Sequence, residues 1–247
     1  MATANPATNV SVYDRAGFAA SAANVMTLHG TIFKTSVLLA ILVAAGSVTW
    51  SRTLDSPTTA YPFMLGGAIV GFIIAMVTIF KPTVSPITAP LYAACQGLFL
   101  GAISAAYNAM YHGLVVQAIG LTLGVLAALL IIYSARIIRA TENFKIGVVA
   151  ATGGVFLVYF VGIILSFFGV HIPLIHQSGW VGIGFSIAVV VIAALNLILD
   201  FDFIETGVQR GAPKYLEWYG GFSLLVTLVW MYLEMLRLLA KLQGSRN

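Results

Sequence analysis

Long apolar stretches separated by short polar connections dominate the chain. Seven of them approach or exceed the roughly 20 residues that a helix needs to cross the apolar core of a bilayer, about 30 Å thick. They lie at about residues 32–51, 61–80, 86–107, 114–134, 147–169, 180–204 and 216–240. The connections span only about 5 to 12 residues, which leaves no room for a second folded domain. The pattern predicts an all-α integral membrane protein whose seven transmembrane helices form one bundle.

Composition agrees with a membrane protein and narrows its partners. Hydrophobic residues make up 60% of the chain and charged residues 8%, against about one quarter charged in soluble domains. The net charge of +4 comes from basic residues scattered between apolar runs, without the basic patch that nucleic-acid binding needs. We therefore expect the lipid bilayer as a partner and no nucleic acid. With a single cysteine, Cys95, no disulfide can form within the chain.

The first 25 residues differ from the rest, because they are polar and small and lack the basic start and apolar core of a cleaved signal peptide. We interpret residues 1–25 as a polar N-terminal tail and residues 26–247 as the seven-helix transmembrane domain. The sequence favours no particular oligomeric state.

Basic residues indicate the orientation, since cytoplasmic loops carry an excess of Lys and Arg. A cytoplasmic N-terminus leaves only Arg52 in the outer loops. It places on the inside Arg15, Lys34, Lys81, Arg136, Arg139, Lys145, Arg210 and Lys214. The C-terminal Arg237, Lys241 and Arg246 fall outside against the rule, and we expect the loops to outweigh them.

Three spacings of the type G-x-x-x-G lie inside predicted spans, at Gly67/Gly71, Gly97/Gly101 and Gly120/Gly124. Small residues four apart allow helix backbones to approach closely in lipid, where no hydrophobic drive holds helices together. We interpret all three pairs as packing sites.

Acidic residues concentrate near the C-terminus. Of eight in the chain, five lie in its last fifth: Asp200, Asp202, Glu205, Glu217 and Glu234. Asp200 lies about 30 Å along a helix that begins near residue 180, so this group is either a solvated helix end or part of a site. Asp200 and Asp202 diverge by about 200° around the helix, and Asn196 extends the face of Asp200 by one turn. We therefore place Asp200 and Asn196 toward the bundle, and Asp202 and Glu205 at the start of a solvated turn.

Glu234 is the most isolated charge, because it follows a long uncharged run in the last span. One interpretation is an i, i+3 ion pair with Arg237 that reaches toward the interface. The other is a buried carboxylate whose pKa is raised by desolvation, or by sharing a proton with a second carboxylate, so that it responds to pH.

Catalytic motifs are absent, since the chain lacks HExxH, G-x-S-x-G, CxxC and the G-x-G-D of intramembrane aspartyl proteases. We predict that the protein is not an enzyme and has no resident cofactor. His171 and His176 offer a weak loop metal site, and no metal ligand is firmly assigned.

Three stretches resemble the Bax inhibitor-1 (YccA-like) family of seven-span membrane proteins, and in particular its bacterial branch. They are "MTLHGTIFKTSVLLAILVAAGSVTW", "TAPLYAACQGLFLGAISAAY" and a C-terminal stretch that begins "LNLILDFDFIETGVQRGAP". The resemblance implies two-helix layers around a central last helix, in the plasma (inner) membrane. It also implies a calcium leak whose opening depends on pH, with calcium transported or transiently bound.

In that family, two carboxylates on the sixth and seventh spans share a proton. Carried over by motif, "LILDFD" offers Asp200, or else Asp202, and "MYLEML" offers Glu234. The second span has no arginine to clamp such a pair, which leaves as candidate cationic partners Arg52, Lys81, Arg136 and Arg237.

The spacing from Asp200 to Glu234 is longer than the family's usual interval. In a simple hairpin that turns near residues 211–213, Asp200 lies about 18 Å and Glu234 about 30 Å from the turn. The two carboxylates then meet only if residues 205–217 make an excursion.

Two hypotheses of function remain. The first is a pH-sensitive cation leak, for calcium, gated by protonation of a carboxylate pair that includes Glu234. The second is a non-transporting membrane protein that modulates a membrane protease or a stress or cell-death pathway, with the N-terminal tail as its contact element.

Overall fold

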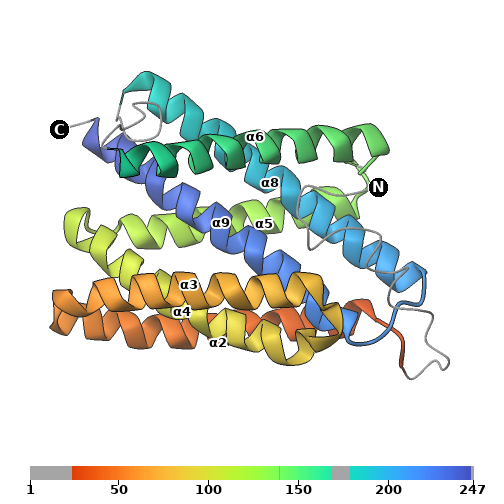
Figure 1. The fold of residues 1–247 in the computed structure, drawn as a ribbon. Helices are drawn as coiled ribbons and strands as arrows, with labels where there is room; N and C mark the ends of the chain where they lie inside the picture. The colour runs from red at the N-terminus through yellow and green to blue at the C-terminus, as the bar shows by residue number, and fades with distance from the viewer. Residues whose placement is uncertain (1–23, 139, 169–178, 246–247) are drawn as a thin grey trace. The chain divides into compact units, whose positions relative to one another are not determined.

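Seven long helices form the structure, a computed structural model that describes residues 24–138, 140–168 and 179–245 (Figure 1). The predicted N-terminal tail lies almost entirely outside the described residues, as do His171 and His176. Each helix is long and apolar enough to cross a membrane, which confirms the predicted all-α membrane fold. They are α2 (Leu28–Asp55), α3 (Ala60–Phe80), α4 (Ser85–Met110), α5 (Leu114–Ser134), α6 (Glu142–Phe167), α8 (Trp180–Gln209) and α9 (Leu216–Gly244).

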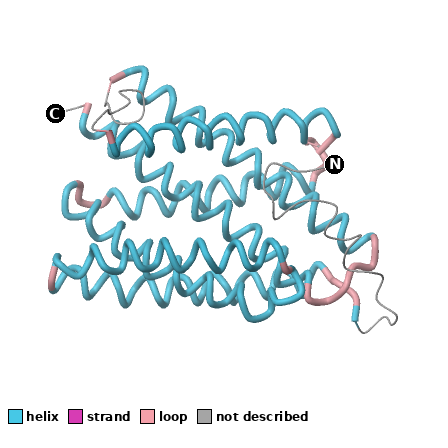
Figure 2. The backbone as a smooth tube through the Cα atoms, in the orientation of Figure 1, coloured by secondary structure: helices cyan, strands magenta, loops and turns pink. Residues whose placement is uncertain are grey.

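The helix ends follow local rules of sequence. Thr27 caps α2 and Thr141 caps α6, each through a side-chain oxygen that accepts from a backbone N–H three residues later. Short 3₁₀ turns, η3 (Pro57–Thr59) and η4 (Pro82–Val84), begin with a proline, which has no N–H to leave unsatisfied there. Among the described residues, loops are short and lie between the helix ends (Figure 2). Most helices extend a few residues beyond the predicted apolar runs.

The described chain divides into two compact units, and the division falls within α8 and α9. One unit comprises residues 1–110 and 200–226, and the other residues 111–199 and 227–247. The last helix contributes to both units. It is the most buried of the seven spans, since 67% of an apolar 18-residue stretch within it is buried.

In the first unit, α2 and α3 both pack against α4. The approach is close because glycines face backbone: a methyl group at Gly101 would overlap the carbonyl of Gly46, and one at Gly67 would lie 2.7 Å from the carbonyl oxygen of Cys95. Such contact replaces the hydrophobic drive that lipid removes. The packing prediction is therefore confirmed for Gly67/Gly71 and Gly97/Gly101.

The packing prediction is wrong for Gly120/Gly124. A methyl group built on either residue meets nothing within 4 Å among the described residues. The spacing alone could not distinguish a face that contacts another helix from one that does not.

The start of α9 completes the first unit. Phe222 meets the ring of Tyr92 from α4 at 4.9 Å, edge to face, and Gly221 allows α9 to lie against Leu38 of α2. Aromatic pairs in this geometry add to the stabilisation from area burial. The same stretch of α9 carries Ser223, which is fully buried.

The second unit contains α5, α6, the first two thirds of α8 and the end of α9. Tyr159 of α6 contacts Phe185 of α8 edge to face, with ring centroids 6.1 Å apart. Polar links in this unit join α6 to α8 and to α9.

Candidate functional site

The turn between α8 and α9 sets the register of the two helices. Gly211 has a φ of 62°, the left-handed conformation that ends a helix most easily when no Cβ is present. The N–H of Ala212 donates to the carbonyl of Gly207 and that of Gly211 to Val208, the Schellman pattern. α9 then begins at Leu216. α8 runs on to Gln209 and residues 210–215 form a short turn, so residues 205–217 make the simple hairpin.

This simple hairpin places Asp200 opposite Ser223. The two residues lie twelve positions before and eleven after Ala212, and both are 0% exposed. The Ser223 hydroxyl donates to Oδ1 of Asp200 at 2.6 Å. An α9 position that faces Asp200 thus carries a hydroxyl.

The polar neighbours of Asp200 on α8 differ in burial according to the side of the helix on which they lie. Asp202 is half-buried, and Glu205 is also half-buried and accepts from the Gln209 amide at 3.1 Å. Asn196 is buried, and its Nδ2 donates to Thr152 of α6 and to the carbonyl of Ile192, both at 2.8 Å. Asn196 therefore joins α8 to α6 in the second unit.

Glu234 has a different set of partners, all in the second unit. Its carboxylate is 2% exposed and accepts from the Tyr159 hydroxyl at 3.0 Å and from Nη1 of Arg237 at 2.9 Å. Arg237 also donates to the Tyr159 oxygen at 2.5 Å and lies over the tyrosine ring, 4.9 Å from its centroid. The i, i+3 pair with Arg237 is present, and it is anchored to α6.

Asp200 and Glu234 thus have separate partners in this structure. Glu234 lies eleven residues beyond Ser223, which is about 16 Å of helix. On α9, Asp200 contacts Ser223 within the first unit.

Of the candidate cationic partners, Arg237 binds Glu234. Arg52 lies in the last turn of α2 and Lys81 follows the last residue of α3. Arg136 follows α5 with a φ of 56°, a left-handed conformation that is unusual for a residue with a Cβ.

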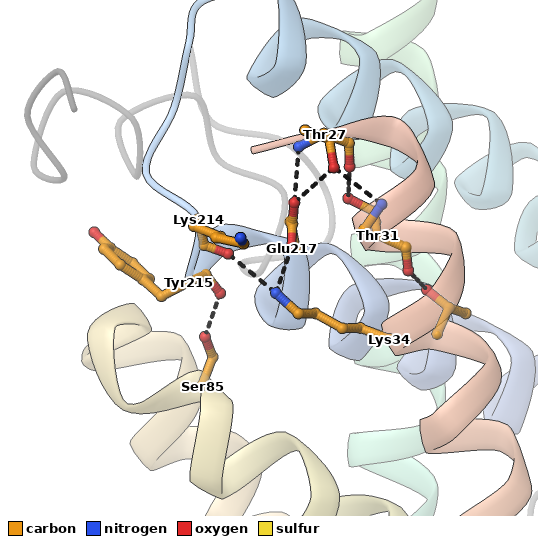
Figure 3. Close-up of polar contacts among 9 residues, drawn as sticks. Thr27, Thr31, Lys34, Ser85, Lys214, Tyr215 and Glu217 are labelled. Carbon is orange, nitrogen blue, oxygen red and sulfur yellow. Dashed lines mark hydrogen bonds and ion pairs between the residues drawn. The ribbon is translucent and has the colours of Figure 1, made fainter. Parts of the chain in front are cut away.

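A third polar cluster was not predicted and joins α9 to α2 (Figure 3). The carboxylate of Glu217, 1% exposed, accepts from the backbone N–H and the hydroxyl of Thr27, both at 2.9 Å, and from the Lys34 ammonium. Ser85 of α4 donates to the Tyr215 carbonyl at 3.0 Å. The available sequence signal was an acidic residue in the first turn of the last helix and a lysine in the second turn of the first.

Lys241 is one of the C-terminal basic residues that fall on the predicted outer side against the rule that cytoplasmic segments carry the Lys and Arg. Its ammonium is buried and donates to the Gly182 carbonyl at 3.0 Å and to the Ser186 hydroxyl at 2.9 Å, both on α8. Because its charge is bonded within the second unit, Lys241 is a weaker indicator of orientation than a loop lysine.

These clusters contain carboxylates that are buried beside hydroxyl groups. Calcium in a tight protein site takes six to eight oxygen ligands. Among the described residues, no three His, Cys, Asp or Glu side chains come together as a metal site would require. A buried carboxylate beside a hydroxyl can still accept a proton or meet a passing cation.

Seven membrane-length helices with carboxylates buried inside them define an integral membrane protein. The family model described as Bax inhibitor 1 like matches residues 5–244, so the chain belongs to that family. This confirms the family resemblance found in the sequence. A search of curated proteins found no significant match to the chain.

Proposed function

We propose that this protein is a pH-sensitive cation leak of the Bax inhibitor-1 type that conducts calcium across the plasma (inner) membrane, with its N-terminus in the cytoplasm. The observation that carries the proposal is Asp200, a fully buried carboxyl group in a spanning helix, bonded to a neutral hydroxyl. Ionisable groups inside a membrane are costly, and they generally mark ion or proton pathways. We propose no enzymatic activity and no resident cofactor.

The mechanism centres on one carboxyl group instead of a pair. The Ser223 hydroxyl can donate to an ionised Asp200 or accept from a protonated one, so either form keeps a hydrogen bond. An ionised Asp200 attracts a cation, whereas a protonated Asp200 is neutral and does not. Proton and calcium then compete for the same oxygens, and the leak decreases as the pH falls.

Glu234 has a supporting role in this proposal. Arg237 matches its charge, and Tyr159 fixes the pair to α6. A neutral, multiply bonded ion pair of this kind fixes the position of α9 against α6 in the second unit. We therefore assign pH sensing to Asp200 and anchoring to Glu234.

The test is calcium flux into vesicles that contain the purified protein and an indicator, measured over a range of pH. Asp200→Asn should keep the fold and lose most of the pH dependence, because an amide does not titrate. Asp202→Asn, at a half-buried position two residues away, is the matched control and should keep the wild-type profile. A wild-type pH profile for Asp200→Asn would overturn the assignment, and no flux above that of empty vesicles would overturn the leak.

A second candidate is a non-transporting protein that modulates a membrane protease or a stress or cell-death pathway. Backbone hydrogen bonds join Asn24 and Met26 to the α8–α9 turn, so a partner bound to the N-terminal tail could act on that hairpin. Deletion of residues 2–23 tests this candidate by co-purification with a membrane protease. Loss of the protease with unchanged flux supports it, and an unchanged complex contradicts the tail as the contact element.

A further inference from the structure

The chain that precedes α2 is attached to the α8–α9 turn through its backbone. The N–H of Met26 donates to the Ala212 carbonyl at 2.6 Å, and that of Lys214 donates to the Asn24 carbonyl at 2.8 Å. These bonds flank an isolated antiparallel bridge between Val25 and Pro213. Segments nearly 190 residues apart in the sequence are therefore held together at one point.

Side chains reinforce this attachment around Glu217 (Figure 3). The Lys34 ammonium donates to one carboxylate oxygen of Glu217, and Thr27 donates twice to the other. The ammonium also lies 5.5 Å from the ring centroid of Trp218, within reach of a cation–π contact. Gly30 provides the space, since a methyl group there would overlap the Glu217 carboxylate.

The attachment is built differently from the helix packing around it. α2 and α4 meet through glycines and backbone. The start of α9 also packs closely on residues 24–34 at Gly220, but hydrogen bonds and one ion pair are added there. A buried ion pair is sensitive to the loss of either member, because the remaining charge then stays buried without compensation. One polar change can therefore release this contact while the α2–α4 packing persists.

The contact lies close to the proposed pH-sensing group. Glu217 precedes Ser223 by six residues, about 9 Å along α9, and Ser223 holds Asp200. All of these residues belong to the first unit. A shift of the start of α9 against α8 would change the distance between Ser223 and Asp200.

We propose that residues 24–34 and 212–217 form a latch that holds the α8–α9 hairpin in its low-leak position, and that opening the latch increases calcium leak. This proposal rests on the proposed leak activity only for its functional consequence. The latch itself is a contact that can be measured without any flux.

The first test locks the latch with a disulfide between Val25→Cys and Pro213→Cys, in a Cys95→Ala background. The flanking hydrogen bonds mark the two residues as a non-hydrogen-bonded pair, whose Cα atoms lie about 4.5 Å apart, within disulfide range. Oxidation should lower the leak at least about twofold, and a reductant should restore it, because the closed population can only rise. The two single-cysteine variants are controls, and neither should respond to oxidation.

The second test opens the latch with Lys34→Met, which keeps most of the aliphatic length and removes the charge. We expect the leak to rise about tenfold, since the loss of a buried partner exceeds the free energy of a tenfold shift. Lys145→Met is the matched control, because Lys145 pairs at 3.6 Å with Glu142, which is 62% exposed. That control should change the leak less than about twofold.

The third test opens the latch sterically and leaves every charge in place. Gly30→Ala should raise the leak because its methyl group displaces the Glu217 carboxylate. Gly66→Ala is its control, a helical glycine with open space around it. This pair keeps the proposal testable if Lys34→Met does not fold.

The decisive experiment combines the disulfide with Lys34→Met. In the double-cysteine protein, Lys34→Met should slow disulfide formation about tenfold, and oxidation should return its leak to the low level. A crosslinked Lys34→Met protein that still leaks fully, or an unchanged crosslinking rate, would overturn the latch. Slower crosslinking without flux in any variant leaves the latch standing and refutes the proposed leak.

Discussion

Ser223→Ala removes the hydroxyl that faces Asp200 and so tests the central contact of the α8–α9 hairpin. The bond is 2.6 Å long, and both residues are fully buried, so water does not readily replace the lost donor. A hydrogen bond to a charged group contributes about 1.5–3 kcal/mol, and a neutral one about 0.5–1.5 kcal/mol. The cost of the substitution therefore depends on whether Asp200 carries a proton.

The expected result has a definite sign. At a pH where Asp200 is ionised, Ser223→Ala should cost about 1.5–3 kcal/mol. At a lower pH where Asp200 is protonated, the cost should fall to about 0.5–1.5 kcal/mol. Stability of the purified protein is measured by reversible denaturation in mixed micelles at each pH.

A double-mutant cycle with Asp200→Asn isolates the contact from other effects of each change. The coupling energy should exceed about 0.5 kcal/mol at high pH and decrease on acidification. A coupling energy near zero throughout would refute the assigned contact. A coupling that does not change with pH would refute Asp200 as the titrating group.

Three further changes test other parts of the structure. Arg237→Met leaves the buried Glu234 without its cation, and we expect the free energy of unfolding to fall by up to about 3 kcal/mol. This is the lower end of the usual range, because the Arg237 side chain is 34% exposed. A cost below about 1 kcal/mol in the same denaturation assay would contradict the pairing. Arg136→Gly replaces a residue with a φ of 56°, so thermal unfolding should show a gain of about 1 kcal/mol, and a loss would indicate that the arginine side chain compensates for the strain. Gly101→Ala should cost about 1–3 kcal/mol by overlap with backbone, whereas Gly120→Ala, with open space, should be neutral or stabilising; equal effects would contradict the close helix crossing.

The transmembrane helices were predictable because their signals are local. A run of about 20 apolar residues must be helical in a bilayer, since every backbone polar group has to be satisfied within the segment. Gly211 is also a local signal, because its left-handed backbone conformation ends α8. Phase around a single helix likewise separated the fully buried Asp200 from the half-buried Asp202.

The partners of the buried charges were not predictable, because they depend on where distant segments meet. Lys34 and Glu217 are 183 residues apart in the sequence, and Ser223 looked like one small polar residue among apolar neighbours. The α9 residue that faces Asp200 depends on where the turn at residues 210–215 ends α8 and lets α9 begin.

The sequence by itself determined the class of protein, its seven spans and its family, because hydrophobic length and family motifs are properties of continuous segments. Only the tertiary structure decided that Asp200 bonds to Ser223, that Arg237 and Tyr159 hold Glu234, and that α2 is tied to the start of α9. Hydrogen bonds act over about 3 Å, so their pairing follows from the register and packing of helices, which no single segment encodes.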